Sequence, residues 1–238
     1  MNRGEMKAVL LAAGKGTRLR PLTDEMPKVM IPIAGKPILE HHVEHLAGAG
    51  IREIFINLHH LPDRITSHFG DGQKWGVRIR YSFEPEILGT AGAVKKLEAE
   101  LRGAPFLVVY GDNFSELDFA DFISWSEKAG GSGTVAVFEK EDVAGSGVVD
   151  IGSGGRIVRF LEKPAPNEVL SHWVNAGIYR LSDDILDDIP RGYSDFGHDI
   201  FPEAIERGRN LFAYRSKEPV WAIDHPELLD ELSQREGT

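Results

Sequence analysis

The sequence has no cysteine among its 238 residues. Disulfide-stabilised scaffolds, thiol nucleophiles and zinc sites built on cysteine are therefore all excluded. No apolar run approaches the ~20 residues that a membrane-spanning helix requires. The N-terminus has neither the long apolar stretch nor the small-residue cleavage site of a secretory signal. We expect a cytoplasmic protein that does not bind membranes.

Basic residues are scarce compared with acidic ones. The chain carries 27 Lys and Arg against 37 Asp and Glu, which gives a formal net charge of −10. A nucleic-acid or anionic-membrane surface would require a basic excess, so neither partner is expected. A polyanionic ligand must instead be bound by a few locally placed cations. The hydrophobic fraction of 42% is large enough to build a buried core.

Strand-like and helix-like segments alternate through the first 140 residues. The expected strands are 9–12, 53–57, 77–83, 106–110 and 134–139, and the expected helices are 37–46, 61–69, 91–101 and 118–129. This alternation predicts an α/β fold with a mostly parallel central sheet covered by helices. Residues 148–150 and 157–160, which the glycine-rich stretch 152–155 joins, predict an added hairpin. We expect one domain over residues 1–238.

The turn after the first strand concentrates glycine and positive charge. Gly14 and Gly16 would let the backbone approach a phosphate, and Arg18 and Lys28 add cations. The turn lacks the third glycine of the dinucleotide fingerprint. It also lacks the Gly-Lys-Ser/Thr ending of the nucleoside-triphosphate loop, so neither motif applies.

The motifs in their order resemble the sugar-1-phosphate nucleotidylyltransferases. The resemblance is carried by Leu11 to Thr23 and then by Pro27-Lys28, Leu88-Gly89-Thr90-Ala91-Gly92, Gly111-Asp112-Asn113, Glu162-Lys163-Pro164, Asn175-Ala176-Gly177-Ile178-Tyr179 and Trp221-Ala222-Ile223-Asp224. The sequence looks most like the mannose-1-phosphate and heptose-1-phosphate guanylyltransferases. Uridylyltransferases acting on N-acetylmuramate 1-phosphate or glucose 1-phosphate are the alternative. The resemblance implies a Rossmann-like fold and a single catalytic domain. Many members of the family carry a C-terminal β-helix domain, and we expect none here because the sequence stops soon after the catalytic motifs.

The family reaction is attack of a sugar 1-phosphate on the α-phosphate of a nucleoside triphosphate, which releases pyrophosphate. The resemblance assigns catalysis to Arg18, Lys28, Asp112, Lys163 and Asp224, with Asp112 and Asp224 holding Mg²⁺. It assigns the nucleotide to Ala12, Ala13, Gly14, Gly16, Thr17, Gly89 and Thr90, and the sugar phosphate to Gly147, Glu162, Lys163 and Asn175. A hard cation held by one or two carboxylates and by substrate phosphates is the usual magnesium mode.

Glu84 follows the strand 77–83, at a position that in the family faces the edge of the base. A carboxylate offers two acceptors that match the two adjacent donors of guanine. The sequence therefore favours GTP as the donor, read in part by Glu84. The alternatives are that Glu86 reads the base, or that Glu84 is a solvated loop residue.

Other residue clusters and alternatives remain open at this stage. Asp183, Asp184, Asp187 and Asp188 are interpreted as a solvated helix face. His41 and His45 share a helix face but have no third ligand at a suitable spacing, so no metal site is expected. A non-catalytic nucleotide-sugar-binding regulatory protein is the alternative from another functional class. The protein could be a monomer or a homodimer.

Overall fold

The computed structural model describes residues 5–223 and Leu228. The chain forms two compact units. Unit 1 contains the residues up to 87, residues 109–115 and those from 220 onward, and unit 2 contains residues 88–108 and 116–219. The strand β6 (Phe106–Tyr110) begins in unit 2 and ends in unit 1. The prediction of a single catalytic domain over residues 1–238 stays a prediction.

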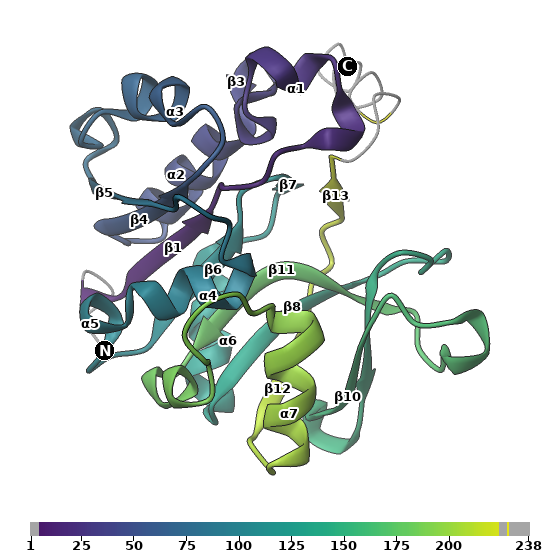
Figure 1. Ribbon diagram of the computed structural model, residues 1–238. Coiled ribbons are helices and arrows are strands. Elements are labelled where there is room, and N and C mark those ends of the chain that lie inside the picture. Colours follow the sequence, from purple (N-terminus) through teal and green to yellow (C-terminus); the bar gives the residue numbers. More distant parts are fainter. Residues whose placement is uncertain (1–4, 224–227, 229–238) are drawn as a thin grey trace. The chain divides into compact units, whose positions relative to one another are not determined.

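Parallel strands form the centre of unit 1. They are β1 (Lys7–Leu11), β4 (Glu53–Leu58) and β5 (Arg78–Phe83). β1 pairs with β4, and β4 pairs with β5. Helices α2 (Ile38–Gly48) and α3 (Pro62–Phe69) form the crossovers and lie beside these strands in the purple-to-blue part of Figure 1. The carboxyl ends of the three strands therefore lie on one edge, where open α/β sheets bind ligands.

Shorter elements complete unit 1. They are the 3₁₀ turns Thr17–Leu19, Lys28–Met30 and Gln73–Trp75, the helix α1 (Leu22–Glu25), and the pairs β2 (Pro32–Ile33) with β3 (Lys36–Pro37) and β7 (Asn113–Ser115) with β13 (Val220–Ala222). Leu19, Ile31, Ile33, Ile38 and Ile223 form one buried cluster. The turn after β1 and the end of β13 thus share a hydrophobic core.

Gly111 lets the chain after β6 come close to β1. Its N–H donates to the carbonyl oxygen of Leu11 at 2.9 Å. A Cβ at this position would lie 2.8 Å from that same oxygen, which is closer than real Cβ contacts allow. A larger residue would therefore push Asp112 away from the end of β1.

The sheet of unit 2 is mixed. Its strands are β8 (Gly133–Glu139), β9 (Gly147–Ile151), β10 (Ile157–Glu162), β11 (Trp173–Leu181) and β12 (Leu211–Arg215). β9 and β10 pair antiparallel as the predicted hairpin, β11 is antiparallel to both β9 and β8, and β12 is parallel to β8. The predicted α/β fold with parallel strands and an added hairpin is confirmed. The antiparallel pairs of the large sheet given above belong to unit 2, and the short pairs β2–β3 and β7–β13 in unit 1 are antiparallel as well.

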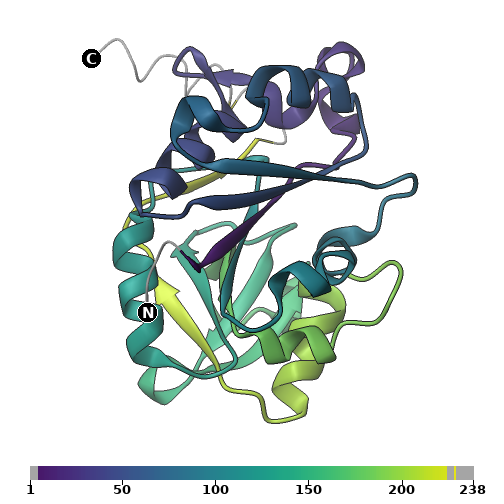
Figure 2. The same ribbon diagram turned by 90° about the vertical axis from the view of Figure 1, so that its left-hand side faces the viewer.

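The helices of unit 2 are α4 (Gly89–Lys96), α5 (Glu98–Leu101), α6 (Phe119–Ala129), α7 (Phe201–Glu206) and the π-helix Phe196–Ile200. Asp118 caps α6 by accepting hydrogen bonds from the N–H groups of Ala120 and Asp121. Figure 2 shows α6 beside the yellow strand β12, where Tyr214 packs edge-on against Phe122. In the part of the chain that the structure describes, no helix is long and apolar enough to span a membrane.

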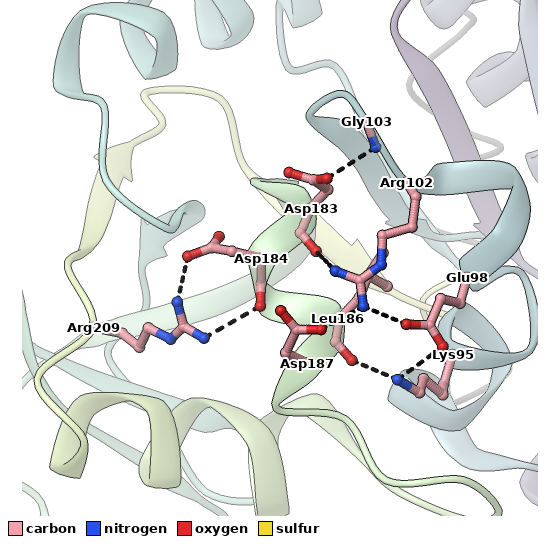
Figure 3. Close-up of polar contacts among 9 residues, drawn as sticks. All are labelled: Lys95, Glu98, Arg102, Gly103, Asp183, Asp184, Leu186, Asp187 and Arg209. Atoms are coloured by element: carbon pink, nitrogen blue, oxygen red, sulfur yellow. Dashed lines mark hydrogen bonds and ion pairs between the residues drawn. The ribbon is translucent and has the colours of Figure 1, made fainter.

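The acidic run at residues 183–188 is partly solvated, since the Asp187 and Asp184 side chains are 61% and 42% exposed. It also pairs with arginines, which the sequence interpretation of a solvated helix face did not include. Most of the run forms a 3₁₀ helix, Asp183–Asp187, and Figure 3 shows Arg209 bonded to Asp184 on one side and Arg102 bonded to the carbonyl of Asp183 on the other. Arg209 also donates its Nε–H to Asp188 at 2.8 Å. The sequence did not reveal this pairing because both arginines lie far from the run along the chain.

Arg209→Ala should lower the free energy of unfolding by about 1–2 kcal/mol, because the Asp188 carboxylate loses its main cation at low exposure. The Asp188 side chain is only 9% exposed, and Arg209 is 25% exposed. Arg207 also contacts Asp188, at 3.2 Å, but it is 54% exposed. Arg207→Ala is therefore the matched control and should cost less than about 1 kcal/mol. Urea denaturation at pH 7 measures both, and equal losses would contradict this assignment.

Candidate functional site

The turn after β1 presents an exposed, positively charged loop. Gly14, Lys15, Thr17 and Arg18 are exposed, whereas Ala12 and Ala13 before them are buried. Gly16 holds the left-handed conformation, with φ 60°, that begins the 3₁₀ turn. The buried hydroxyl of Thr23 donates to the Gly16 carbonyl oxygen at 2.8 Å. The loop is thus fixed from within, and its outer face remains accessible to a ligand.

A buried amide joins the ends of the three parallel strands. The N–H of Ala12, just after β1, donates to Asn57 Oδ1 of β4 at 2.6 Å. Asn57 Nδ2 donates in turn to Glu84 Oε1, just after β5, at 2.8 Å. Asn57 is 3% exposed and Glu84 is 0% exposed. This chain of hydrogen bonds fixes the position of Ala12, just before the exposed glycine-rich loop begins.

The position of Glu84 does not support the direct base contact expected from sequence. Its side chain has no exposed surface, and its Oε1 accepts from Asn57. Its backbone is also held, because the N–H donates to the Leu58 carbonyl and the carbonyl accepts from His59 Nδ1. The alternative of a solvated loop residue is excluded as well. The structure instead places Glu84 beneath the loop as a support for Asn57.

Lys28 and Asp112 form an ion pair in unit 1. Lys28 Nζ donates to Asp112 Oδ2 at 2.7 Å, and the side chains are 8% and 36% exposed. The lysine follows Pro27 in a 3₁₀ turn, and Gly111 places the aspartate beside β1. A nearly buried cation thus orients a carboxylate that faces solvent.

The chain near Asp112 also meets the C-terminal strand β13. Ala222 pairs with Asn113 across β7 and β13, and the Ile223 N–H lies 3.4 Å from the Asp112 carbonyl oxygen. His42 supports this segment from α2 by donating Nε2–H to the Asn113 carbonyl at 2.6 Å. Burial lowers the pKa of His42 to about 4, so this histidine is neutral at pH 7. Asp224, the second expected metal ligand, lies outside the described residues.

Gly147, Glu162 and Lys163 come together at the open end of the hairpin in unit 2. Gly147 is the register partner of Glu162 across β9 and β10. Lys163 follows with a left-handed φ of 51°, and its N–H donates to the Ser146 carbonyl. Such a conformation is uncommon for a residue with a side chain and suggests a functional position. The Lys163 side chain is 63% exposed, with Nζ 4.0 Å from Glu162 Oε1.

The environment of Glu162 favours its protonated form more than water does. Burial raises the pKa of its carboxyl, and the charge of Asp195 raises it further. Lys163 and His198 act in the opposite direction. The side chain is 19% exposed. A desolvated carboxyl of this kind is suited to hydrogen bonding with hydroxyl groups.

Asn175 uses its amide inside the protein. Its Oδ1 accepts from the Gly177 N–H at 2.9 Å, and its Nδ2 donates to the Tyr179 hydroxyl at 2.8 Å. These bonds lie at the irregularity where β11 shifts register against β8. Since Val174 pairs with Val148, the strands place Asn175 close to Gly147 along the sheet. Asn175 therefore shapes this end of β11 beside the predicted sugar residues.

Thr90, expected at the nucleotide, directs its hydroxyl to a residue that the sequence reasoning missed. Its Oγ1 donates to Asp195 Oδ2 at 2.8 Å and accepts from the Phe196 N–H at 2.9 Å. Gly89 has a φ of 74°, and its N-terminal loop is held by Ser194, whose N–H donates to the Leu88 carbonyl. Asp195 caps the helix that begins at Phe196, and an aspartate before a helix is a usual capping signal in a sequence. Only the fold brings this segment to Thr90.

The described residues contain no cluster of three or more acidic, histidine or cysteine side chains suited to a metal. His41 donates its Nε2–H to the Ile33 carbonyl oxygen at 2.7 Å.

Comparison with known proteins gives a consistent match. A family model described as "Nucleotidyl transferase" matches residues 7–222. The UTP–glucose-1-phosphate uridylyltransferase of Synechocystis sp. is 40% identical over 222 residues, covering 87% of this chain and 57% of that protein. The mannose-1-phosphate guanyltransferase beta-B of Xenopus laevis is 37% identical over 213 residues, covering 87% and 58%. The chain thus spans less than two thirds of the length of these curated relatives.

A solved structure covers nearly the whole chain. HddC from Yersinia pseudotuberculosis, complexed with GMP-PN, has a TM-score of 0.81 and 28% sequence identity, and the match covers 97% of this chain and 99% of that one. These comparisons confirm the resemblance that the sequence motifs indicated.

If Glu84 supports Asn57, Glu84→Gln should leave the free energy of unfolding within about 1 kcal/mol of wild type, because glutamine still offers Asn57 an acceptor. Glu84→Ala should cost about 2–4 kcal/mol, since a buried donor loses its partner and a cavity opens. Glu86, which is exposed, provides the control, and Glu86→Ala should change stability by less than about 0.5 kcal/mol. Urea denaturation measures all three.

The same variants separate the two roles of Glu84. A supporting role leaves the ratio of kcat/KM for GTP and UTP unchanged in Glu84→Gln. A change of about tenfold in this ratio would instead indicate that Glu84 contacts the base directly. A bidentate base contact contributes about 1–3 kcal/mol of discrimination.

Proposed function

Because the chain belongs to the nucleotidyl transferase family, we propose that it transfers a nucleoside monophosphate from a nucleoside triphosphate to a sugar 1-phosphate. An oxygen of the sugar 1-phosphate forms a bond to the α-phosphorus. The bond from the α-phosphorus to the oxygen that bridges to the β-phosphorus breaks, and pyrophosphate leaves with that electron pair. The products are a nucleoside diphosphate sugar and pyrophosphate.

Such a reaction requires positioning and charge neutralisation rather than a protein nucleophile. The observation that carries the proposal is the Lys28–Asp112 pair beside an exposed glycine-rich loop. The loop at Gly14, Gly16 and Thr17 offers backbone N–H donors to the triphosphate, together with Ala12 and Ala13 at its start. Arg18 and Lys28 supply the cations that stabilise the departing pyrophosphate.

Asp112 fits a role as a magnesium ligand, and we propose Asp224 as the second. Lys28 takes Oδ2 of Asp112, and the carboxylate is more than one third exposed. Carboxylates with substrate phosphate oxygens form the usual set for Mg²⁺. When bound, the ion would neutralise phosphate charge. The antiparallel approach of β13 to β7 supports the pairing, because the chain reaches Asp112 at Ile223.

Unit 2 supplies the sugar-phosphate side of the proposal. Lys163 is an exposed cation in a left-handed conformation, suited to the phosphate. Glu162 accepts hydrogen bonds from sugar hydroxyls, and Gly147 leaves room beside it. Asn175 shapes the adjoining strand. Gly89 and Thr90, which we propose for the nucleotide, begin α4, and Ser194 and Asp195 hold this end of the helix in place.

We propose GTP as the donor and a mannose- or heptose-type sugar 1-phosphate as the acceptor. Relatives named as mannose-1-phosphate guanyltransferases support GTP. UTP with glucose 1-phosphate or N-acetylmuramate 1-phosphate is the second candidate, and the Synechocystis uridylyltransferase favours it. The buried position of Glu84 removes the residue-level argument for guanine, so the choice rests on the relatives. We propose a cytoplasmic monomer or homodimer.

A panel of nucleoside triphosphates and sugar 1-phosphates with Mg²⁺ tests the proposal by pyrophosphate release. We expect turnover with GTP and mannose 1-phosphate or a heptose 1-phosphate. A preference for UTP or dTTP would overturn the guanine assignment alone. Absence of turnover with every pair, alongside tight binding of a nucleoside diphosphate sugar, would instead indicate a non-catalytic binding protein.

Asp112→Asn should lower kcat by about 100-fold or more, because a neutral amide replaces a carboxylate at the site of charge neutralisation. Asp63→Asn is the matched control. It makes the same change at an exposed position in the first turn of α3 and should leave kcat within about twofold. Steady-state kcat of both variants is measured at saturating Mg²⁺. Near-normal turnover of Asp112→Asn would rule out the role of Asp112 as a magnesium ligand.

A further inference from the structure

Two glycines enclose the carboxylate of Glu162 in unit 2. A Cβ built on Gly197 would lie 2.5 Å from Glu162 Oε2, and a Cβ on Gly147 would lie 2.7 Å from the same oxygen. Both distances are below 3.0 Å, which real Cβ atoms essentially never show. Both would also come within 3.2 Å of the Phe160 ring. A side chain at either position would therefore require the Glu162 carboxylate to move from the slot between the two glycines.

The backbone of Gly197 does not require glycine. Gly197 and Gly147 are not among the glycines with positive φ, so the reason for glycine is space. Gly197 lies in the π-helix Phe196–Ile200, an uncommon element that often marks functional sites. At Gly197 the backbone of the π-helix lies against Phe160 and Glu162 at the end of β10.

Asp195 fixes this short helix. Its Oδ1 accepts from the Gly197 N–H at 2.9 Å and from the His198 N–H at 3.3 Å. Its other oxygen, Oδ2, accepts from the Thr90 hydroxyl at 2.8 Å. The Asp195 N–H donates to Asp199 Oδ2 at 2.7 Å. One side chain thus ties the first turn of α4 to the backbone that confines Glu162.

We propose that Asp195 and Gly197 are positioning residues for the sugar 1-phosphate, acting by holding the Glu162 carboxyl against the hairpin end where the sugar hydroxyls bind. This inference rests on the proposed function and adds two residues to it. Asp195 and Gly197 touch Glu162 or its support rather than the reacting phosphates. Their effect should therefore fall on binding of the sugar phosphate.

The charges facing Glu162 support this role. Burial raises its pKa first, Asp195 raises it further, and Lys163 and His198 lower it. Replacing Asp195 by asparagine keeps the shape of the cap and removes one negative charge. The pKa of Glu162 should then fall in Asp195→Asn.

Gly197→Ala tests the spatial argument. The added methyl group displaces the carboxylate, so the KM for the sugar 1-phosphate should rise by about tenfold or more while the KM for the nucleotide stays within about twofold. Gly48→Ala is the matched control, because a Cβ there meets nothing within 4 Å and the residue has no positive φ. Its kinetics should match wild type.

A double variant guards against general damage by Gly197→Ala. Glu162→Asp withdraws the carboxylate by one methylene group, which relieves the clash. The loss in kcat/KM for Gly197→Ala combined with Glu162→Asp should be smaller than the product of the two single losses. If the two single losses in kcat/KM multiply fully in the double variant, Gly197 and Glu162 act independently and the inference is wrong.

Carbon-13 titration of the Glu162 carboxyl provides a readout that needs no turnover, with the signal identified by its loss in Glu162→Gln. A lower pKa in Asp195→Asn supports the inference, and an unchanged one overturns it. If wild type releases no pyrophosphate but the pKa falls as expected, the proposed function fails and the positioning of Glu162 stands. If wild type turns over and the sugar KM of Gly197→Ala is unchanged, the inference fails and the function stands.

Discussion

The amide of Asn57 is the interaction on which the proposed nucleotide-binding loop depends. Three parallel strands end at one edge of unit 1, and Asn57 joins the residue after β1 to the residue after β5. A buried donor or acceptor without a partner is costly, so this bridge strongly favours one arrangement of the strand ends. The exposed loop that follows Ala12 therefore starts from a fixed point.

Unit 2 positions the carboxylate of Glu162 by a different arrangement. For the proposed hydrogen bonds to sugar hydroxyls, this carboxylate must stay desolvated and must not form a strong ion pair. In this fold Glu162 lies between two glycines, and Asp195 holds one of them through a cap to the π-helix. Lys163 remains mostly exposed and only 4.0 Å away, so it does not neutralise Glu162 completely. The positive charge is left available for a phosphate.

The residues of the proposed function come from both units. Arg18, Lys28 and Asp112 belong to unit 1, and Glu162 and Lys163 belong to unit 2. Because the formal net charge is −10, the composition does not favour a general anion-binding surface, and the binding of phosphates depends on these few local cations. The acidic run at 183–188 adds stability rather than chemistry, since its carboxylates are held by Arg102 and Arg209.

The sequence by itself determined the α/β class, the hairpin and the family. Alternating apolar segments report burial directly, and a glycine-rich turn followed by Arg18 and Lys28 is a local pattern. It also indicated Asp112, because a residue that follows a buried strand must lie at the carboxyl edge of the sheet. Tertiary structure alone decided the positions of Glu84, Asp195 and Gly197. Glu84 became a buried support because Asn57, 27 residues away, reaches it. Gly197 matters through an oxygen 35 positions earlier in the chain, and only packing brings those two atoms together.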